Sequence, residues 1–127
     1  MTDTTPATAP ADDRLRIAPE HRELLDQVLD KWSLHVLDEL CERPLRFNEL
    51  RRAIPVVTQK SLTTTLRRLE RNGMVDRVVV SSRPVAVEYR ISRLGRTIQD
   101  LIDALYVWSA DNMPRVEEAR ARFDADG

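Results

Sequence analysis

Hydrogen-bonding and cationic side chains crowd one short stretch of this chain, residues 58–71. In the major groove of DNA, glutamine pairs with adenine, arginine and lysine pair with guanine, and the threonine methyl contacts thymine. Leu62, Leu66 and Leu69 recur in the same stretch at helical spacing, so a helix would turn the polar side chains to the opposite face. The candidates for base contact in this helix are Thr58, Gln59, Lys60, Thr63, Thr64, Arg67 and Arg71.

Three consecutive threonines, residues 63–65, distinguish this helix from an ordinary solvent-facing one. Outward lysine and arginine are common on any exposed helix, so the cationic side chains alone leave that alternative open. Threonine is a poor helix former, however, and a plain exposed surface would not favour three in a row. The pattern therefore favours a helix that contacts DNA.

Charge is sorted along the chain. The formal net charge is -1, yet residues 43–96 hold thirteen Lys and Arg against four Asp and Glu, and the rest of the chain is acidic. A locally basic segment attracts polyanions because a partner meets the local field rather than the net charge; an arginine-rich surface that merely faces solvent is the alternative. Phosphate contacts need positive charge with reach rather than fixed spacing. Outside the helix over residues 58–71, the candidates for phosphate contact are Arg46, Arg51, Arg77 and Arg83.

Composition excludes several other classes of protein. A length of 127 residues allows one domain, three glycines are too few for a glycine-rich phosphate loop, and no apolar run approaches the roughly 20 residues of a membrane helix. Cys41 is the single cysteine, and His21 and His35 lack neighbouring ligands for a metal. No nucleophile and base stand at a recognisable catalytic spacing. We expect no catalytic residues, metal, cofactor or membrane partner, and a cytoplasmic location, because the acidic first residues are unlike a secretory signal.

Hydrophobic periodicity divides the chain into helices and one pair of strands. Asp30, Thr58 and Ser92 are candidate N-caps, and Pro44 and Pro55 are helix stops. At Asp30 the alternative is that the helices on either side run together without a break. Two valine-rich segments with a period of two indicate a β-hairpin. In order, the sequence predicts a helix from about His21, a helix over Lys31–Glu42 and a short helix over Asn48–Ile54. A helix from Thr58 to about Asn72 follows, with Gly73 in the left-handed conformation after it. Two strands, over 75–80 and 86–91, precede a last helix that begins after Ser92 and runs through Trp108 or beyond.

The order of these elements predicts a mainly α fold with a small β-hairpin, a winged helix-turn-helix with flanking dimerisation helices. Residues 1–13 are too polar to pack, and residues 1–17 are expected to form a disordered tail. Residues 18–113 form the DNA-binding domain in this interpretation. Pro114 is expected to kink or restart the last helix, leaving residues 114–127 as a short helix or a frayed tail. A winged-helix module that binds proteins without touching DNA is the alternative.

The first and last predicted helices carry more apolar surface than one small core can cover. We expect the surplus to pack against a second copy of the chain. The candidates for this interface are Leu24, Val28, Leu29, Trp32, Ile98, Leu101, Ile102, Leu105, Tyr106 and Trp108. A small aromatic effector of unknown identity between Trp32 and Trp108 is an alternative use of the same surface.

Several stretches of the sequence resemble the HxlR-type winged-helix regulators of bacteria. They are KWSL at 31–34, RFNELRRAIP at 46–55 and TQKSLTTTLRRLERNGMV at 58–75, with VEY at 87–89 and LG at 94–95. The resemblance covers about Leu24 to Trp108. It implies a homodimeric transcription factor that pairs through its first and last helices and binds an inverted repeat in double-stranded DNA.

The chain departs from that family at two places. Members often carry a cysteine just before the first helix, which some use to sense oxidants or electrophiles, but Pro19-Glu20-His21 stands there in this chain. Many members also have glycines where this chain has Leu29-Asp30. Cys41 follows Leu40 on an apolar stripe and is expected to be a small buried hydrophobe, although Arg43 nearby leaves a redox role open. A thiol switch is therefore not expected.

Overall fold

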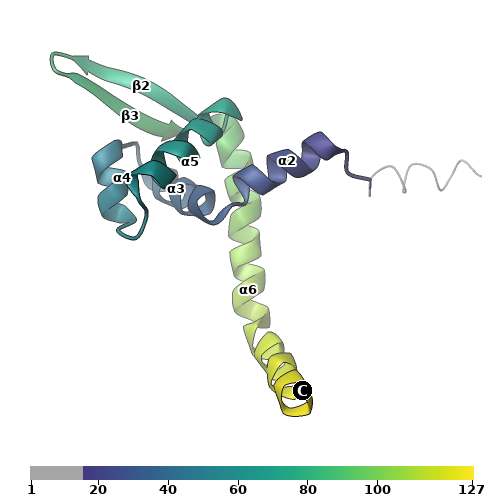
Figure 1. The fold of residues 1–127 in the computed structure, drawn as a ribbon. Coiled ribbons are helices and arrows are strands. Elements are labelled where there is room, and N and C mark those ends of the chain that lie inside the picture. The colour runs from purple at the N-terminus through teal and green to yellow at the C-terminus, as the bar shows by residue number, and fades with distance from the viewer. Residues whose placement is uncertain (1–15) are drawn as a thin grey trace, which may run out of the picture.

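The computed structural model describes residues 16–127, so the tail expected over residues 1–17 lies outside it except for Arg16 and Ile17. Figure 1 shows a body of packed helices from which a β-hairpin and two further helices project. This is the mainly helical winged helix-turn-helix that the sequence predicts. In chain order the elements are α2 (Pro19–Val28), α3 (Lys31–Glu42), β1 (Leu45–Arg46), α4 (Phe47–Ala53), α5 (Gln59–Arg71), β2 (Val75–Ser82), β3 (Val85–Ile91) and α6 (Arg93–Asp126).

Local signals fix the helix ends where the sequence predicts them. The Asp30 carboxylate accepts a hydrogen bond from the backbone N–H of Trp32 at 3.1 Å, which begins α3 and separates it from α2. The Thr58 hydroxyl accepts from the N–H of Ser61 at 3.0 Å and begins α5. Each cap satisfies a backbone donor that the first turn leaves unpaired. After α5, Gly73 takes φ +79° and turns the chain out of the helix.

A third strand, β1, joins the hairpin. The strand order is β1-β3-β2, both pairings are antiparallel, and Leu45 lies opposite Tyr89. The sequence predicts only the hairpin, because a strand of two residues has no readable period. The hairpin is also longer than expected, since only Arg83 and Pro84 lie between β2 and β3.

The core is centred on α3. Leu37 and Leu40 of this helix are fully buried, and Leu50 of α4 and Leu62 and Leu66 of α5 belong to the same cluster. Burial of leucine side chains stabilises such a cluster by about 1.5–3 kcal/mol each. This packing holds α4 and α5 against α3 and leaves the opposite side of α5 open.

Two residues expected at a subunit interface belong to this core instead. Val28 and Ile102 are each 1% exposed, because the last turn of α2 and one side of α6 pack against α3. Their side chains are therefore unavailable to a second copy of the chain. Trp32 and Ile98 are partly buried against the same cluster.

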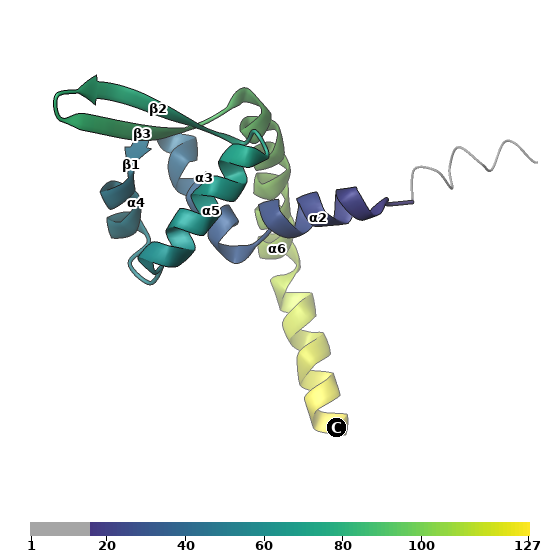
Figure 2. The same ribbon diagram turned by 45° about the horizontal axis from the view of Figure 1, so that its top comes forward.

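The last helix, α6, continues well beyond Trp108. Its 34 residues include Pro114, so the short helix or frayed tail expected for residues 114–127 is the end of one continuous helix. A proline removes one backbone hydrogen bond, but the residues that follow are mostly good helix formers. Glu118 and Arg122 also form an i,i+4 ion pair at 3.2 Å. Figures 1 and 2 show this part of α6 extending away from the body.

Candidate nucleic-acid interface

The helix α5 turns its leucines inward and most of its polar side chains outward. Leu62, Leu66 and Leu69 are buried, as the apolar stripe predicts. Thr65, the third member of the threonine run, is buried with them at 4% exposure, so only two of the three threonines face outward. The exposed residues at the start and along the outer side of α5 include all the predicted candidates: Thr58, Gln59, Lys60, Thr63, Thr64, Arg67 and Arg71.

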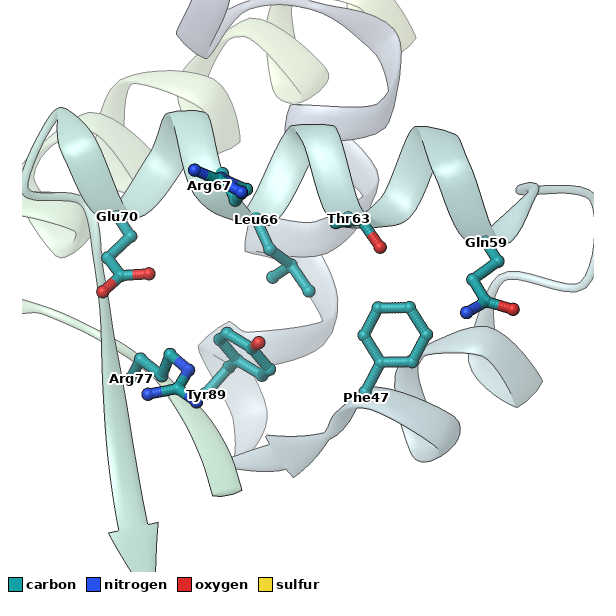
Figure 3. A pocket seen from close by; sticks show the side chains of 8 residues that line it. All are labelled: Phe47, Gln59, Thr63, Leu66, Arg67, Glu70, Arg77 and Tyr89. Carbon is teal, nitrogen blue, oxygen red and sulfur yellow. The ribbon is translucent and has the colours of Figure 1, made fainter. Parts of the chain in front are cut away.

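A groove runs between this outer side of α5 and the hairpin (Figure 3). Its volume is about 590 Å³, and α4 closes one end of it. Gln59, Thr63 and Arg67, at successive turns of α5, line the groove together with Arg77 of β2, and in Figure 3 Gln59 and Arg77 lie at its opposite ends. Four predicted residues from two elements therefore meet in one place. Lys60, Thr64 and Arg71 are exposed but do not line the groove, whose full lining is Phe47, Gln59, Thr63, Leu66, Arg67, Glu70, Arg77 and Tyr89.

Sequence reasoning missed the aromatic floor and the acidic end of the groove. Phe47 and Tyr89 are partly buried against the core, and their rings lie opposite α5 in Figure 3. Tyr89 pairs with Arg77 across the two strands, so both side chains project from the same side of the sheet. The register that brings them together was not readable from the sequence. Glu70, by contrast, follows Arg67 by three residues, and helical spacing could have placed it beside the groove.

Within the described part of the chain, the arginines predicted to bind DNA form no salt bridges. Salt bridges in residues 16–127 join Arg43 to Glu49, Arg90 to Glu88 and Arg122 to Glu118. None of them involves a predicted DNA contact. The arginines without a salt-bridge partner among the described residues therefore include Arg46, Arg51, Arg67, Arg71, Arg77 and Arg83.

Besides Arg71 at the end of α5, three of these arginines lie away from the groove on other elements. Arg83 is exposed in the turn between β2 and β3, at the far end of the projecting hairpin (Figure 1). Arg46 lines a second hollow, of about 730 Å³, between α4 and β3. Arg51 is exposed on α4 beside Arg52 and Pro55. Arg46, Arg51 and Arg83 therefore extend the positive surface beyond α5 rather than joining one site.

Exposed apolar side chains gather on α2 and α6. On α2, Leu24 and Leu29 are exposed, together with Leu25, which the sequence analysis did not select. On α6, Leu101 is 62% exposed and Trp108 is 58% exposed. The remaining exposed interface candidates on α6 are Leu105 and Tyr106.

Neither tryptophan lines any of the five main hollows of residues 16–127. Trp32 lies beneath the Lys31 ammonium, 4.5 Å from the ring centroid, and its ring is 5.8 Å from that of His35. A hollow of about 190 Å³ beside Tyr106 is lined by neither tryptophan. An aromatic effector between Trp32 and Trp108 stays a prediction that this arrangement does not support.

The other chemistries considered from the sequence find no site in the described part of the chain. Residues 16–127 contain no group of three or more His, Cys, Asp or Glu side chains placed to hold a metal ion. Cys41 is partly buried, and its thiol is free. Among the helices of these residues, none combines the length and the apolarity that crossing a membrane requires.

Comparison with known proteins places the chain in a family. A model of the HxlR-like helix-turn-helix matches residues 27–117. The HTH-type transcriptional regulator YtcD of Bacillus subtilis is 38% identical over 92 residues, which cover 72% of this chain and 73% of that protein. The solved structure of the transcriptional regulator ytfH from Salmonella typhimurium is 35% identical, with a TM-score of 0.69 over 80% of this chain and 90% of that one. The redox regulator HypR in its reduced form is 34% identical, with a TM-score of 0.69 over 80% of this chain and 99% of that one. The chain thus belongs to the HxlR-like helix-turn-helix family of transcriptional regulators, which is not a family of enzymes.

Proposed function

We propose that this regulator binds double-stranded DNA in the cytoplasm as a homodimer and places one α5 in each half of an inverted repeat. The observation that carries the proposal is the groove that Gln59, Thr63 and Arg67 of α5 line together with Arg77 of the hairpin. An α-helix fits the major groove, and a hairpin beside it reaches the neighbouring sugar-phosphate backbone. The side chains of α5 would contact base edges, and those of the hairpin would bind the sugar-phosphate backbone and so fix the position of α5 along the DNA.

Electrostatics support DNA as the partner. An arginine without a carboxylate partner is free to bind phosphate, and each phosphate that is neutralised releases counterions. Arg46 of β1, Arg51 of α4 and Arg83 of the hairpin turn are exposed and extend this positive surface beyond α5. A module that binds only proteins would not need such a surface, and its affinity would not fall steeply as salt is added.

The exposed leucines of α2 and α6 support the homodimer. Several large apolar side chains exposed on one helix are costly in water and are typical of an interaction site. A second copy would cover it symmetrically, because the same patch then serves both subunits. Two recognition helices related by a twofold axis would read half-sites that repeat in inverted orientation.

The experiment is a selection of bound duplexes from random sequence by the full-length chain, with light scattering of the free protein and of the complex. We expect an inverted repeat whose half-site centres lie about 34–36 Å apart, or a multiple of that distance, and a dimer mass in both samples. Leu105→Glu should yield a monomer and lose the repeat. Ala110→Glu adds the same charge on another side of α6 and should keep both. A stable monomer at micromolar concentration, or no enriched sequence, would contradict the proposal.

A further inference from the structure

The C-terminal end of α5 is held by the same two helices that carry the exposed leucines. The Asn72 side-chain amide donates a hydrogen bond to the side-chain carbonyl of Gln27, at the end of α2, at 2.9 Å. The Ser92 hydroxyl, which caps α6, donates to the Gly73 carbonyl at 2.6 Å. One end of the proposed reading helix therefore contacts both helices of the proposed dimer interface.

The contact with α2 is firmly supported on both sides. The backbone carbonyl of Gln27 accepts a hydrogen bond from the Ser33 hydroxyl at 2.6 Å, and Ser33 is 1% exposed in the core. On the α5 side, the Asn72 N–H bonds to the Arg68 carbonyl at 3.0 Å, which closes the last turn. The hydrogen bond between Gln27 and Asn72 thus joins two ordered backbone segments, and both side chains are partly buried.

We propose that Gln27 and Asn72 are positioning residues that fix the angle of α5 against the dimer helices and thereby select the spacing between half-sites. This inference rests on the proposed function. The reading end of α5, at Gln59, lies at the opposite end of the helix from Asn72.

The length of α5 makes this angle important. Its 13 residues span about 20 Å. A tilt of about 10° about the C-terminal end would move the N-terminal end by about 3.5 Å, close to the rise of about 3.4 Å between base pairs. A small change in the tilt of α5 at Asn72 would therefore shift the N-terminal end of this helix by about one base pair along the DNA.

Two isosteric substitutions test the hydrogen bond between Gln27 and Asn72 without creating a cavity. Gln27→Glu keeps an acceptor for the Asn72 amide, and Asn72→Asp keeps an acceptor for the Gln27 amide after that side chain rotates. In the double variant, the two carboxylates of residues 27 and 72 lie against each other, and the hydrogen bond is lost because neither carboxylate can donate. Gln27→Glu with Ala110→Glu is the control, because it adds the same charge while Ala110 is exposed on another side of α6.

The measurement is affinity for duplexes that carry the selected repeat with its spacer unchanged, or lengthened or shortened by one base pair. We expect the two single variants and the control to keep the wild-type ratio between best and altered spacers within about twofold. The double variant should lower that ratio by about tenfold, which is a loss of about 1.4 kcal/mol of discrimination.

The outcomes separate the two proposals. A double variant that keeps the wild-type ratio, or single variants that lose it as fully as the double, would overturn the positioning role and leave the proposed function intact. A uniform loss of affinity across all spacers would also overturn it, because added charge alone would produce that result. A wild-type chain that binds none of the duplexes would overturn the proposed function and this inference with it.

Discussion

Gly95 occupies the first turn of α6 where that helix presses on the end of the α5–β2 connection. A Cβ added at this position would lie 2.2 Å from the Met74 carbonyl oxygen and 2.8 Å from a side-chain carbon of Ile91. The first contact is with backbone, so relief requires α6 to move. The same turn carries the Ser92 hydroxyl bond to Gly73, at 2.6 Å. Gly95→Ala should therefore loosen the attachment of α6 to the end of α5.

The expected change in the free energy of unfolding is the sum of one stabilising and two destabilising effects of Gly95→Ala. Helix propensity alone would make alanine better than glycine by about 0.8–1.0 kcal/mol. Overpacking costs about 1–3 kcal/mol, and loss of a hydrogen bond costs about 0.5–1.5 kcal/mol more. We expect Gly95→Ala to lower the free energy of unfolding by about 2 kcal/mol, measured by urea denaturation at one fixed protein concentration because a dimer's stability depends on it.

Ala110→Gly is the control for this measurement. Ala110 is exposed on the same helix, so this change tests propensity without a clash and should cost about 1 kcal/mol. One substitution replaces glycine by alanine and the other replaces alanine by glycine, yet both should destabilise the protein. If Gly95→Ala stabilised the protein, the close approach of α6 to the Met74 carbonyl would be wrong.

Tyr106→Phe removes the hydrogen bond that the hydroxyl donates to the Asp38 carboxylate at 2.7 Å and should cost about 0.5–1.5 kcal/mol at neutral pH. Partial burial, then the hydrogen bond and charge of Asp38, raise the pKa of Tyr106 to about 12. Since the unfolded value is about 10, the advantage of tyrosine over phenylalanine should be present below pH of about 10 and lost as the pH rises through about 12; unfolding curves at stepped pH that kept a constant difference would refute this. Thr58→Ala removes the cap of α5 and should cost about 1 kcal/mol in urea denaturation, whereas Thr58→Ser should match the wild type; equal stability of all three would refute the cap. Cys41→Ala should bind the selected duplex as the wild type does, with or without peroxide, because Cys41 is the single cysteine and is partly buried; release of the wild type alone by oxidant would show a thiol switch.

Features written in short sequence motifs were predictable. Asp30, Thr58 and Gly73 each act through neighbouring backbone, so their places at helix ends could be inferred without knowing the rest of the fold. The same holds for the buried stripe of α5, because a helix has a fixed period. These local signals were enough to predict helix α5 and the hairpin.

Features set by tertiary contacts were not predictable in the same way. Val28 shares an apolar stripe with Leu24, and only the packing of α2 on α3 decides that Val28 is buried and Leu24 is exposed. Tyr89 joins the groove through the strand register that pairs it with Arg77. Pro114 suggested a kink or restart followed by a short helix or a frayed tail, but the helix-forming residues after it continue α6 to Asp126.

The central claim is that α5 reads bases while the hairpin holds the backbone, and Arg67→Ala and Arg83→Ala test it most directly. The measurement is a binding titration of both variants at several salt concentrations, on the selected duplex and on a scrambled one. Arg67→Ala should lose about 1–3 kcal/mol on the selected duplex and relax the choice of base there. Arg83→Ala should weaken both duplexes evenly and lower the salt slope by about one. If Arg67→Ala left base preference intact while Arg83→Ala abolished it, the hairpin rather than α5 would be the reading element.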